Sequence, residues 1–108
     1  MSRIFTTDID PVLYISGTHT LDELDAQDYL GAKYMIVGQS GSGIVEISEF
    51  LVVHDYTAAQ VSNVITVGNR TPFVASFSAA YLRGFLRLTM VNTLPLKVRV
   101  YRTLIEAE

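Results

Sequence analysis

The chain has 108 residues, a net charge of −3 and no cysteine. A chain of this length has room for one domain with one core, and without cysteine it has neither a disulfide framework nor a zinc–thiolate site. The pI of 5.2 and the scattered basic residues argue against a nucleic-acid partner, and no run approaches the roughly 18 apolar residues of a membrane span, so we expect no membrane partner.

The apolar content is high for so small a chain, since 49% of the residues are hydrophobic and only 18% are charged. A small domain exposes much of its surface, and large exposed apolar patches are uncommon unless another chain covers them. The composition therefore predicts oligomerisation or assembly with other chains. The N-terminus lacks the apolar core of a signal peptide, so we expect synthesis in a cytoplasm.

The beginning of the chain is expected to form an extended arm and one short strand. Asp10-Pro11 disfavours regular structure, so residues 1–11 are interpreted as an arm, and residues 12–16 suit a short strand. The predicted domain boundaries are 1–19 for the arm with its strand and 20–108 for a β-sandwich domain.

The stretch after Gly17 allows two interpretations. Thr20 and Glu23 have the spacing of a capping box, in which the two side chains satisfy each other's backbone N–H at the start of a helical turn. The same stretch also suits an edge strand with Leu21 and Leu24 facing the core. The sequence leaves both interpretations open.

From Gly31 onward the chain alternates between apolar and polar residues with the period of two that a half-buried strand requires. Strands are predicted at 32–37, 44–54, 60–67, 73–77, 85–91 and 96–104, with turns at 39–43, 55–57, 68–72 and 83–84. The Gly-Ser-Gly turn joins two strands, which predicts a hairpin loop rather than a phosphate site. We therefore predict an all-β fold, a small antiparallel β-sandwich of about seven or eight short strands with an extended N-terminal arm.

Strand 44–54 is apolar on both faces, which is typical of a strand that is central in a sandwich or covered by a neighbouring subunit. One face carries Val45, Ile47, Leu51 and Val53, interrupted by Glu49. The other carries Phe50 and Val52 with a polar stripe of Glu46, Ser48 and His54. The sequence does not decide which face is the core. The stripe is interpreted as a wet face or a subunit contact, and a sugar site formed with some of the six tyrosines is the alternative.

The last two strands are predicted to form a hairpin. Their apolar residues must share a buried face, and this requires a loop of odd length; the residues concerned are Leu86, Leu88, Met90, Leu96, Val98 and Val100. A loop at 93–95 is favoured because it sets Arg87 opposite Tyr101, whereas a longer loop opposes Arg87 and Arg99, two like charges. In either register Arg87, Lys97 and Arg99 share an outer face.

Each histidine lies beside acidic residues that suggest a catalytic or metal site, and in each case a structural interpretation is simpler. His54-Asp55 is reminiscent of a catalytic pair, but adjacent strand residues point to opposite faces, which favours a turn. His19 with Asp22 and Asp25 could contact a metal ion, but a divalent site needs more convergent ligands, which favours a solvated acidic loop. No set of nucleophile, base and orienting group is present, so we expect no enzyme, no metal site and no cofactor.

The charges are unevenly distributed along the chain. Residues 1–30 carry six acids and one arginine, whereas residues 31–108 carry seven basic residues and five acids. An acidic beginning and a mildly basic body could pair head to tail between subunits. A solvated acidic segment ahead of an ordinary domain is the alternative.

Three stretches carry a family resemblance: 29–37 reads YLGAKYMIV, 49–58 reads EFLVVHDYTA, and 97–105 reads KVRVYRTLI. In this order they resemble a virion structural module of tailed bacteriophages, especially contractile-tailed cyanophages. That family shows an A-K-Y strand, a glycine-containing turn, an E-x-L-x-V-H-D-G-T strand and turn, and an ending close to K-V-x-R-T-L-I. The resemblance spans about residues 20–105, and Tyr56 stands where the family favours glycine.

The resemblance implies a non-enzymatic virion structural protein, made in the host cytoplasm and located in the virion. The leading interpretation is a capsid decoration or cement protein that contacts the major capsid protein through its arm and strand edges. Such a protein is expected to be a homo-oligomer, with a trimer favoured. A tail, neck or baseplate accessory or fibre subunit is one alternative, and a carbohydrate-binding receptor module is another. The candidate interface residues are the acids Asp22, Glu23, Asp25 and Asp28, with Arg83, Arg87, Lys97 and Arg99 as their partners on a neighbouring copy.

Overall fold

The computed structural model describes residues 4–107, with side chains from residue 7 onward. Its strands form two antiparallel sheets that face each other, so the predicted all-β sandwich is confirmed, with nine strands in the described part in place of about seven or eight. The strands are β1 (Ile4–Tyr14), β2 (Gly17–Asp25), β3 (Tyr29–Gln39), β4 (Val45–His54), β5 (Ala59–Val61), β6 (Ile65–Gly68), β7 (Ala75–Leu82), β8 (Phe85–Asn92) and β9 (Leu96–Glu106).

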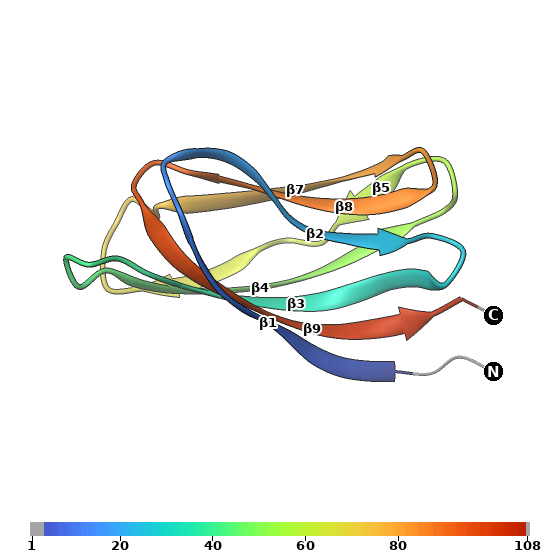
Figure 1. Ribbon diagram of the computed structural model, residues 1–108, viewed down its shortest axis with the longest axis horizontal. Coiled ribbons are helices and arrows are strands. Elements are labelled where there is room, and N and C mark those ends of the chain that lie inside the picture. Colours follow the sequence, from blue (N-terminus) through green and yellow to red (C-terminus); the bar gives the residue numbers. More distant parts are fainter. Residues whose placement is uncertain (1–3, 108) are drawn as a thin grey trace.

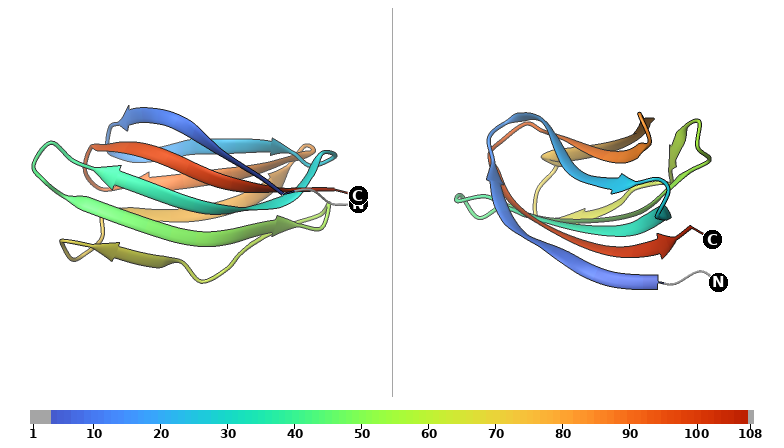
Figure 2. Two further views of the ribbon diagram at one scale, coloured as in Figure 1. Left: turned by 90° about the horizontal axis from the view of Figure 1, so that it is seen from below. Right: turned by 45° about the vertical axis from the view of Figure 1, so that its right-hand side comes forward.

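The larger sheet has six strands in the order β1-β9-β3-β4, and the short strands β5 and β6 both pair with the far edge of β4. The smaller sheet has the order β2-β8-β7 and covers the inner face of the larger one (Figure 1). Figure 2 (left) shows the larger sheet from its outer side. Alternate residues of both sheets meet in the core, and those from β8 and β9 are at most 3% exposed: Leu86, Leu88, Met90, Leu96, Val98 and Val100.

The structure differs from the expected N-terminal arm, because residues 4–14 form β1, an edge strand paired with β9 along its length. The register shifts between Ile9 and Val12, and Asp10 and Pro11 lie in this bulge. Proline lacks the N–H that a strand ladder requires, but edges and bulges tolerate it. The Asp-Pro pair therefore interrupts the ladder without ending the strand. The first three residues of the predicted arm lie outside the described part.

β2 decides between the two interpretations of the stretch after Gly17, since it is an edge strand and not a helical turn. Leu21 and Leu24 are both buried, as the strand interpretation requires. Residues three apart normally face opposite sides of a strand. The register shift between Thr20 and Asp22 is a bulge that turns both leucines inward.

β8 and β9 do not form the predicted hairpin. β8 lies between β2 and β7 in the small sheet, β9 lies between β1 and β3 in the large sheet, and residues 93–95 carry the chain from one sheet to the other. The predicted buried residues are confirmed, but the pairing is wrong, since Arg87 lies opposite Glu23 of β2. Arg87 therefore lies on the outer face of the small sheet, and Lys97 and Arg99 lie on the outer face of the large one.

Candidate functional site

β4 turns its polar stripe toward the core. The buried side chains of this strand are Glu46, Ser48, Phe50, Val52 and His54. The interpretation of the stripe as a wet face is therefore wrong. A polar side chain can be buried when it has hydrogen-bond partners, and each of the three polar groups has one within the chain.

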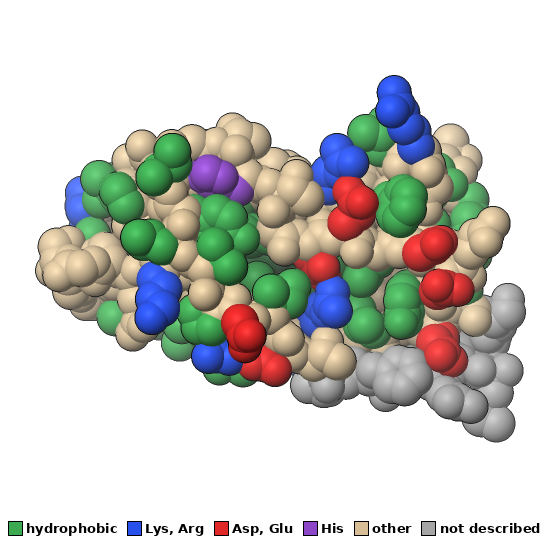
Figure 3. All heavy atoms as spheres, viewed as in Figure 1, with side chains coloured by type: hydrophobic (Ala, Val, Ile, Leu, Met, Phe, Trp, Pro, Cys, Tyr) green, Lys and Arg blue, Asp and Glu red, His purple; other side chains and the backbone are tan. Residues whose placement is uncertain are grey.

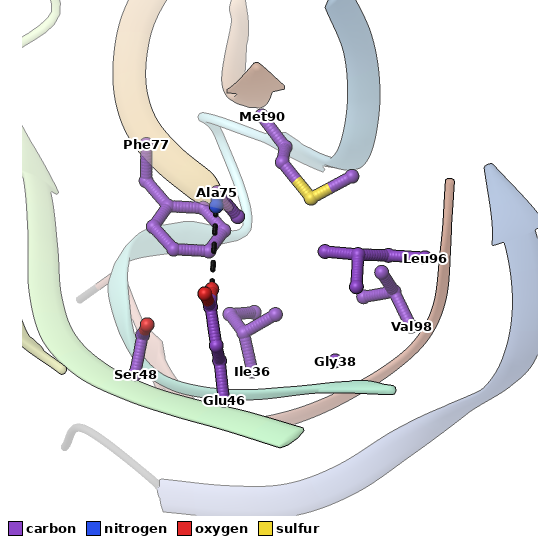
Figure 4. Close-up of a pocket in the computed structure, with 9 residues that line it drawn as sticks. All are labelled: Ile36, Gly38, Glu46, Ser48, Ala75, Phe77, Met90, Leu96 and Val98. Carbon is purple, nitrogen blue, oxygen red and sulfur yellow. Dashed lines mark hydrogen bonds between the residues drawn. The ribbon is translucent and has the colours of Figure 1, made fainter. Parts of the chain in front are cut away.

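Glu46 connects the two sheets. Its carboxylate accepts hydrogen bonds from the backbone N–H groups of Val74 and Ala75, the latter at 3.2 Å. Figure 4 shows Glu46 pointing from β4 toward Ala75 at the start of β7. The cavity beside it measures about 10 Å³, which is room for one water molecule at most. Next along the stripe, the Ser48 hydroxyl lies 2.8 Å from that of Thr66. The stripe is thus a structural bridge with no space for a ligand.

His54 and Asp55 form a turn, as the sequence predicted. The Nδ1 atom of His54 accepts the Tyr56 N–H at 3.1 Å, so Nε2 carries the hydrogen and donates to the Tyr29 carbonyl at 2.7 Å. Asp55 is exposed, and its Oδ1 accepts the N–H groups of Ala58 and Thr57, which lower the pKa of this carboxyl. Neither side chain points at the other, and no hydrogen bond joins them.

A buried ionic network joins β2 to the large sheet. Asp22 accepts a hydrogen bond from the Tyr34 hydroxyl at 2.8 Å and an ionic one from the Arg102 guanidinium at 2.6 Å. Arg102 also donates to the Thr7 hydroxyl at 2.9 Å, which ties β1 into the same network. Asp22 was expected to face a neighbouring subunit, and that expectation is wrong because its charge is neutralised inside its own chain. Tyr34 and Arg102 were not singled out from the sequence.

We expect the stability of the protein to fall steeply above pH 10, and Tyr34 to contribute. Burial, the charge of Asp22 and the hydrogen bond to it raise the pKa of Tyr34 far above its usual 10.0. Above pH 10 the unfolded chain loses this proton and the folded chain keeps it, so stability is intact below pH 10 and declines above it by up to about 1.4 kcal/mol per pH unit for this group.

Urea unfolding at pH 7, 10, 11 and 12 measures the decline. The variant Tyr34→Phe is expected to be less stable at pH 7, because it lacks the bond to Asp22, and to lose less stability between pH 10 and pH 12. Equal declines in the two proteins would contradict the assignment to Tyr34.

The other predicted interface residues lie mostly at strand ends and on opposite faces. Glu23 and Arg87 pair within the small sheet at 2.9 Å. Asp25 accepts the Gln27 N–H in the β2–β3 turn at 2.9 Å, and the Asp28 carbonyl accepts the N–H of residue 107. Figure 3 shows acidic side chains gathered at the right-hand end of one face, while acidic and basic side chains lie beside each other elsewhere on it. The predicted set therefore does not form a single surface.

The basic members of the set are equally dispersed. Arg99 pairs with Asp8 of β1 at 2.6 Å on the outer face of the large sheet. Arg83 lies in the β7–β8 turn, and Lys97 lies on β9 near the opposite end of the sandwich. Within residues 4–107 no three His, Cys, Asp or Glu side chains group closely enough to hold a metal ion. The described part also contains no helix long and apolar enough to cross a membrane.

Asn92 joins two of the four connections that cross between the sheets, and it was not singled out from the sequence. Its Nδ2 donates to the carbonyls of Ile15 and Leu94, at 3.0 and 2.8 Å. Ile15 lies between β1 and β2, and Leu94 lies between β8 and β9, so one buried amide holds both connections together.

The edge of β7 differs from the other strand edges of the sandwich. Edge strands are usually protected against pairing with other chains by charges, prolines, bulges or short length. β1 and β2 each have a bulge and several acids, and β5 and β6 have three and four residues. β7 has eight residues, ASFSAAYL, without a charge, a proline or a register shift. It is the least protected edge in the described part of the chain.

Half of the backbone groups of β7 point away from the sheet. The β7–β8 turn has two residues, Arg83 and Gly84, both with positive φ (53° and 85°), so Leu82 and Phe85 beside it form a hydrogen-bonded pair. Hydrogen-bonded and non-hydrogen-bonded pairs alternate along the ladder, so the N–H and C=O groups of Tyr81, Ala79, Phe77 and Ala75 point outward. Of these, the N–H of Ala75 already donates to Glu46.

An open apolar groove of about 500 Å³ runs beside the first half of this edge. Its lining contains no charged residue and consists of Val64, Ile65, Thr66, Phe73, Ala75, Ser76 and Phe77. The far end of β7 lies next to β5 (Figure 1), where Tyr81 stacks on His54 with ring centroids 5.4 Å apart. An outward-pointing backbone beside an uncharged groove is the arrangement that receives an added strand.

The outer face of the large sheet is a second candidate surface. Eight apolar side chains are exposed on β3, β4, β6 and β9, with Ile65 and Val67 the most exposed at 66% and 70%; the others are Met35, Val45, Ile47, Leu51, Val53 and Tyr101. The prediction that this chain leaves apolar area for another chain remains a prediction, and this face is where that area lies.

Comparison with known proteins assigns neither a family nor a function, since no family model and no curated protein matches the chain. Function is therefore inferred from the residues and geometry of the chain itself.

Proposed function

We propose that this chain is a non-enzymatic structural protein of a bacteriophage virion, most directly a capsid decoration protein. It binds the head by accepting an extended segment of the capsid protein as an added strand beside β7. Binding buries apolar surface in the groove and satisfies the outward backbone groups of β7, and both effects stabilise the particle.

The observation that carries the proposal is the unprotected edge of β7 beside its uncharged groove. The resemblance of residues 20–105 to the virion module supplies the class of partner. The turn at Tyr56 is compatible with that resemblance, because φ there is 65°, a conformation that glycine adopts readily. The stripe that a glycan-binding module would use is buried, so no observation favours that alternative.

The copy number of the chain in purified virions, measured by quantitative mass spectrometry against the major capsid protein, tests the location. A ratio near one to one or one to three is expected for a decoration protein. A ratio of a few per hundred would move the chain to the tail, neck or baseplate. Absence from the particle would overturn the structural function.

Two matched variants test the β7 edge. Ser78 and Thr20 lie opposite the same residue of β8, Thr89, on the two edges of the small sheet, and both are exposed. Ser78→Lys protects the β7 edge with a charge and is expected to weaken binding to particles that lack the chain by at least about tenfold in Kd. Thr20→Lys adds the same charge at the other edge and should bind as the wild type does. Equal binding of the two variants would refute attachment through β7.

A further inference from the structure

The outer face of the large sheet is nearly neutral as well as apolar. Rows of side chains run across the strands in register: Val37 lies opposite Ile47, which lies opposite Val67. Lys33 and Glu49 pair across β3 and β4 at 3.7 Å, with half or nearly half of each side chain exposed. They are the only charged residues among the outward-facing positions of β3, β4 and β6, so this part of the face carries one charge of each sign. The other charges of the outer face, Lys97 and the Arg99–Asp8 pair, lie on β9 and β1 beside it.

The size of the face suits a specific contact. The exposed parts of the eight apolar side chains amount to several hundred square ångströms, the scale of the roughly 800 Å² that each partner contributes to a standard interface. The outer face of the small sheet has fewer exposed large apolar side chains, Leu82, Phe85 and Val91, and they lie among residues such as Ser76, Ser78 and the Glu23–Arg87 pair. The larger exposed apolar surface is therefore that of the large sheet.

We propose that a second copy of this chain covers the outer face of the large sheet, forming a twofold dimer with the two large sheets packed face to face. A twofold axis brings the same patch onto itself, and a patch holding one lysine and one glutamate is then complementary to its own copy. Lys33 of each protomer meets Glu49 of the other, and the apolar rows around them pack as in a sandwich. A partner of strong net charge would find no complement here.

The dimer deepens the proposed function by supplying the homo-oligomeric partner. It leaves the β7 strand open because β7 belongs to the other sheet, although Ile65 borders both the dimer face and the groove beside β7. It is tested on the purified full chain in solution by sedimentation equilibrium at micromolar concentrations. The attachment site is tested on particles, so either proposal can fail alone.

Charge reversal at the centre of the face is the decisive experiment. Lys33→Glu and Glu49→Lys each place like charges together, and each is expected to weaken the dimer by at least about tenfold in Kd. The double variant with both charges exchanged restores opposite signs and should associate like the wild type. Both side chains are about half exposed, and circular dichroism would check that each variant is folded.

Arg87→Glu is the control, because it reverses a charge in the exposed Glu23–Arg87 pair on the other sheet. It should leave the dimer unchanged. A monomeric wild type would overturn the proposal, as would a trimer. Single reversals that leave Kd unaffected, or a double variant that fails to restore association, would also overturn it.

Discussion

Replacement of Asp22 by alanine is expected to lower the free energy of unfolding by about 3 kcal/mol. Asp22 is 9% exposed and receives hydrogen bonds from Tyr34 and Arg102. In the variant, the partly buried Arg102 guanidinium loses its ionic partner, and the Tyr34 hydroxyl loses its hydrogen-bond acceptor. Removal of one member of a buried ion pair costs more than the pair contributes, because the remaining charge is poorly solvated. Urea unfolding at pH 7 measures the change.

Two comparisons isolate the ionic contribution. Glu23→Ala removes an acid from the neighbouring exposed pair with Arg87 and should cost at most about 1 kcal/mol. Arg102→Met combined with Asp22→Ala removes both charges and should recover part of the loss, since no charge is then left behind. A loss at Asp22 no larger than that at Glu23 would contradict this account.

Replacement of Gly31 by alanine is expected to destabilise the protein by about 2–3 kcal/mol or more. A Cβ atom on Gly31 would lie 2.1 Å from the carbonyl oxygen of Val52, a backbone atom of the neighbouring strand. β3 and β4 are paired along their lengths, so the strands must separate at this point and weaken the ladder. A flexible side chain could move aside, but a paired backbone cannot do so without losing hydrogen bonds.

Gly41→Ala is the matched control for Gly31→Ala. Gly41 lies in the β3–β4 hairpin loop, and nothing lies within 4 Å of a Cβ placed there. Thermal and urea unfolding should show a change within about 0.5 kcal/mol at this position. Equal effects at the two glycines would mean that the close approach to Val52 does not limit the packing of the two strands.

Alternation along the chain was sufficient to predict the fold class and much of the core. It placed Leu88 and Val98 on buried faces. For Leu21 and Leu24 an inward-facing edge strand was one of two interpretations left open, and the bulge that turns both inward was not predicted. It did not predict that β8 and β9 belong to different sheets. A hairpin and a crossing between sheets both place the same alternate residues inside, so the alternation of apolar and polar residues cannot distinguish them.

The candidate surfaces were only partly predictable for a related reason. Strand 44–54 shows two apolar faces, and hydrophobicity gives no preference between Ile47 outside and Glu46 inside. The choice depends on the backbone N–H groups of Val74 and Ala75, which lie 28 and 29 residues away from Glu46 in the chain. Likewise, the charge of Asp22 was visible in the sequence, but its partner Arg102 on a distant strand was not.

The position of β9 between β1 and β3 has a consequence for synthesis on the ribosome. β9 is the last of the nine strands to leave the ribosome, and it is the one that joins the first strand to the third. The β3–β4 hairpin can form early, but β1 has no place in the sheet until β9 emerges. The large sheet is therefore expected to close only after β9 has emerged, and the abundance of contacts between distant segments favours slow folding. Chains that stall before Leu96 would expose the edges of both β1 and β3, and these nascent chains would be the species most prone to aggregation.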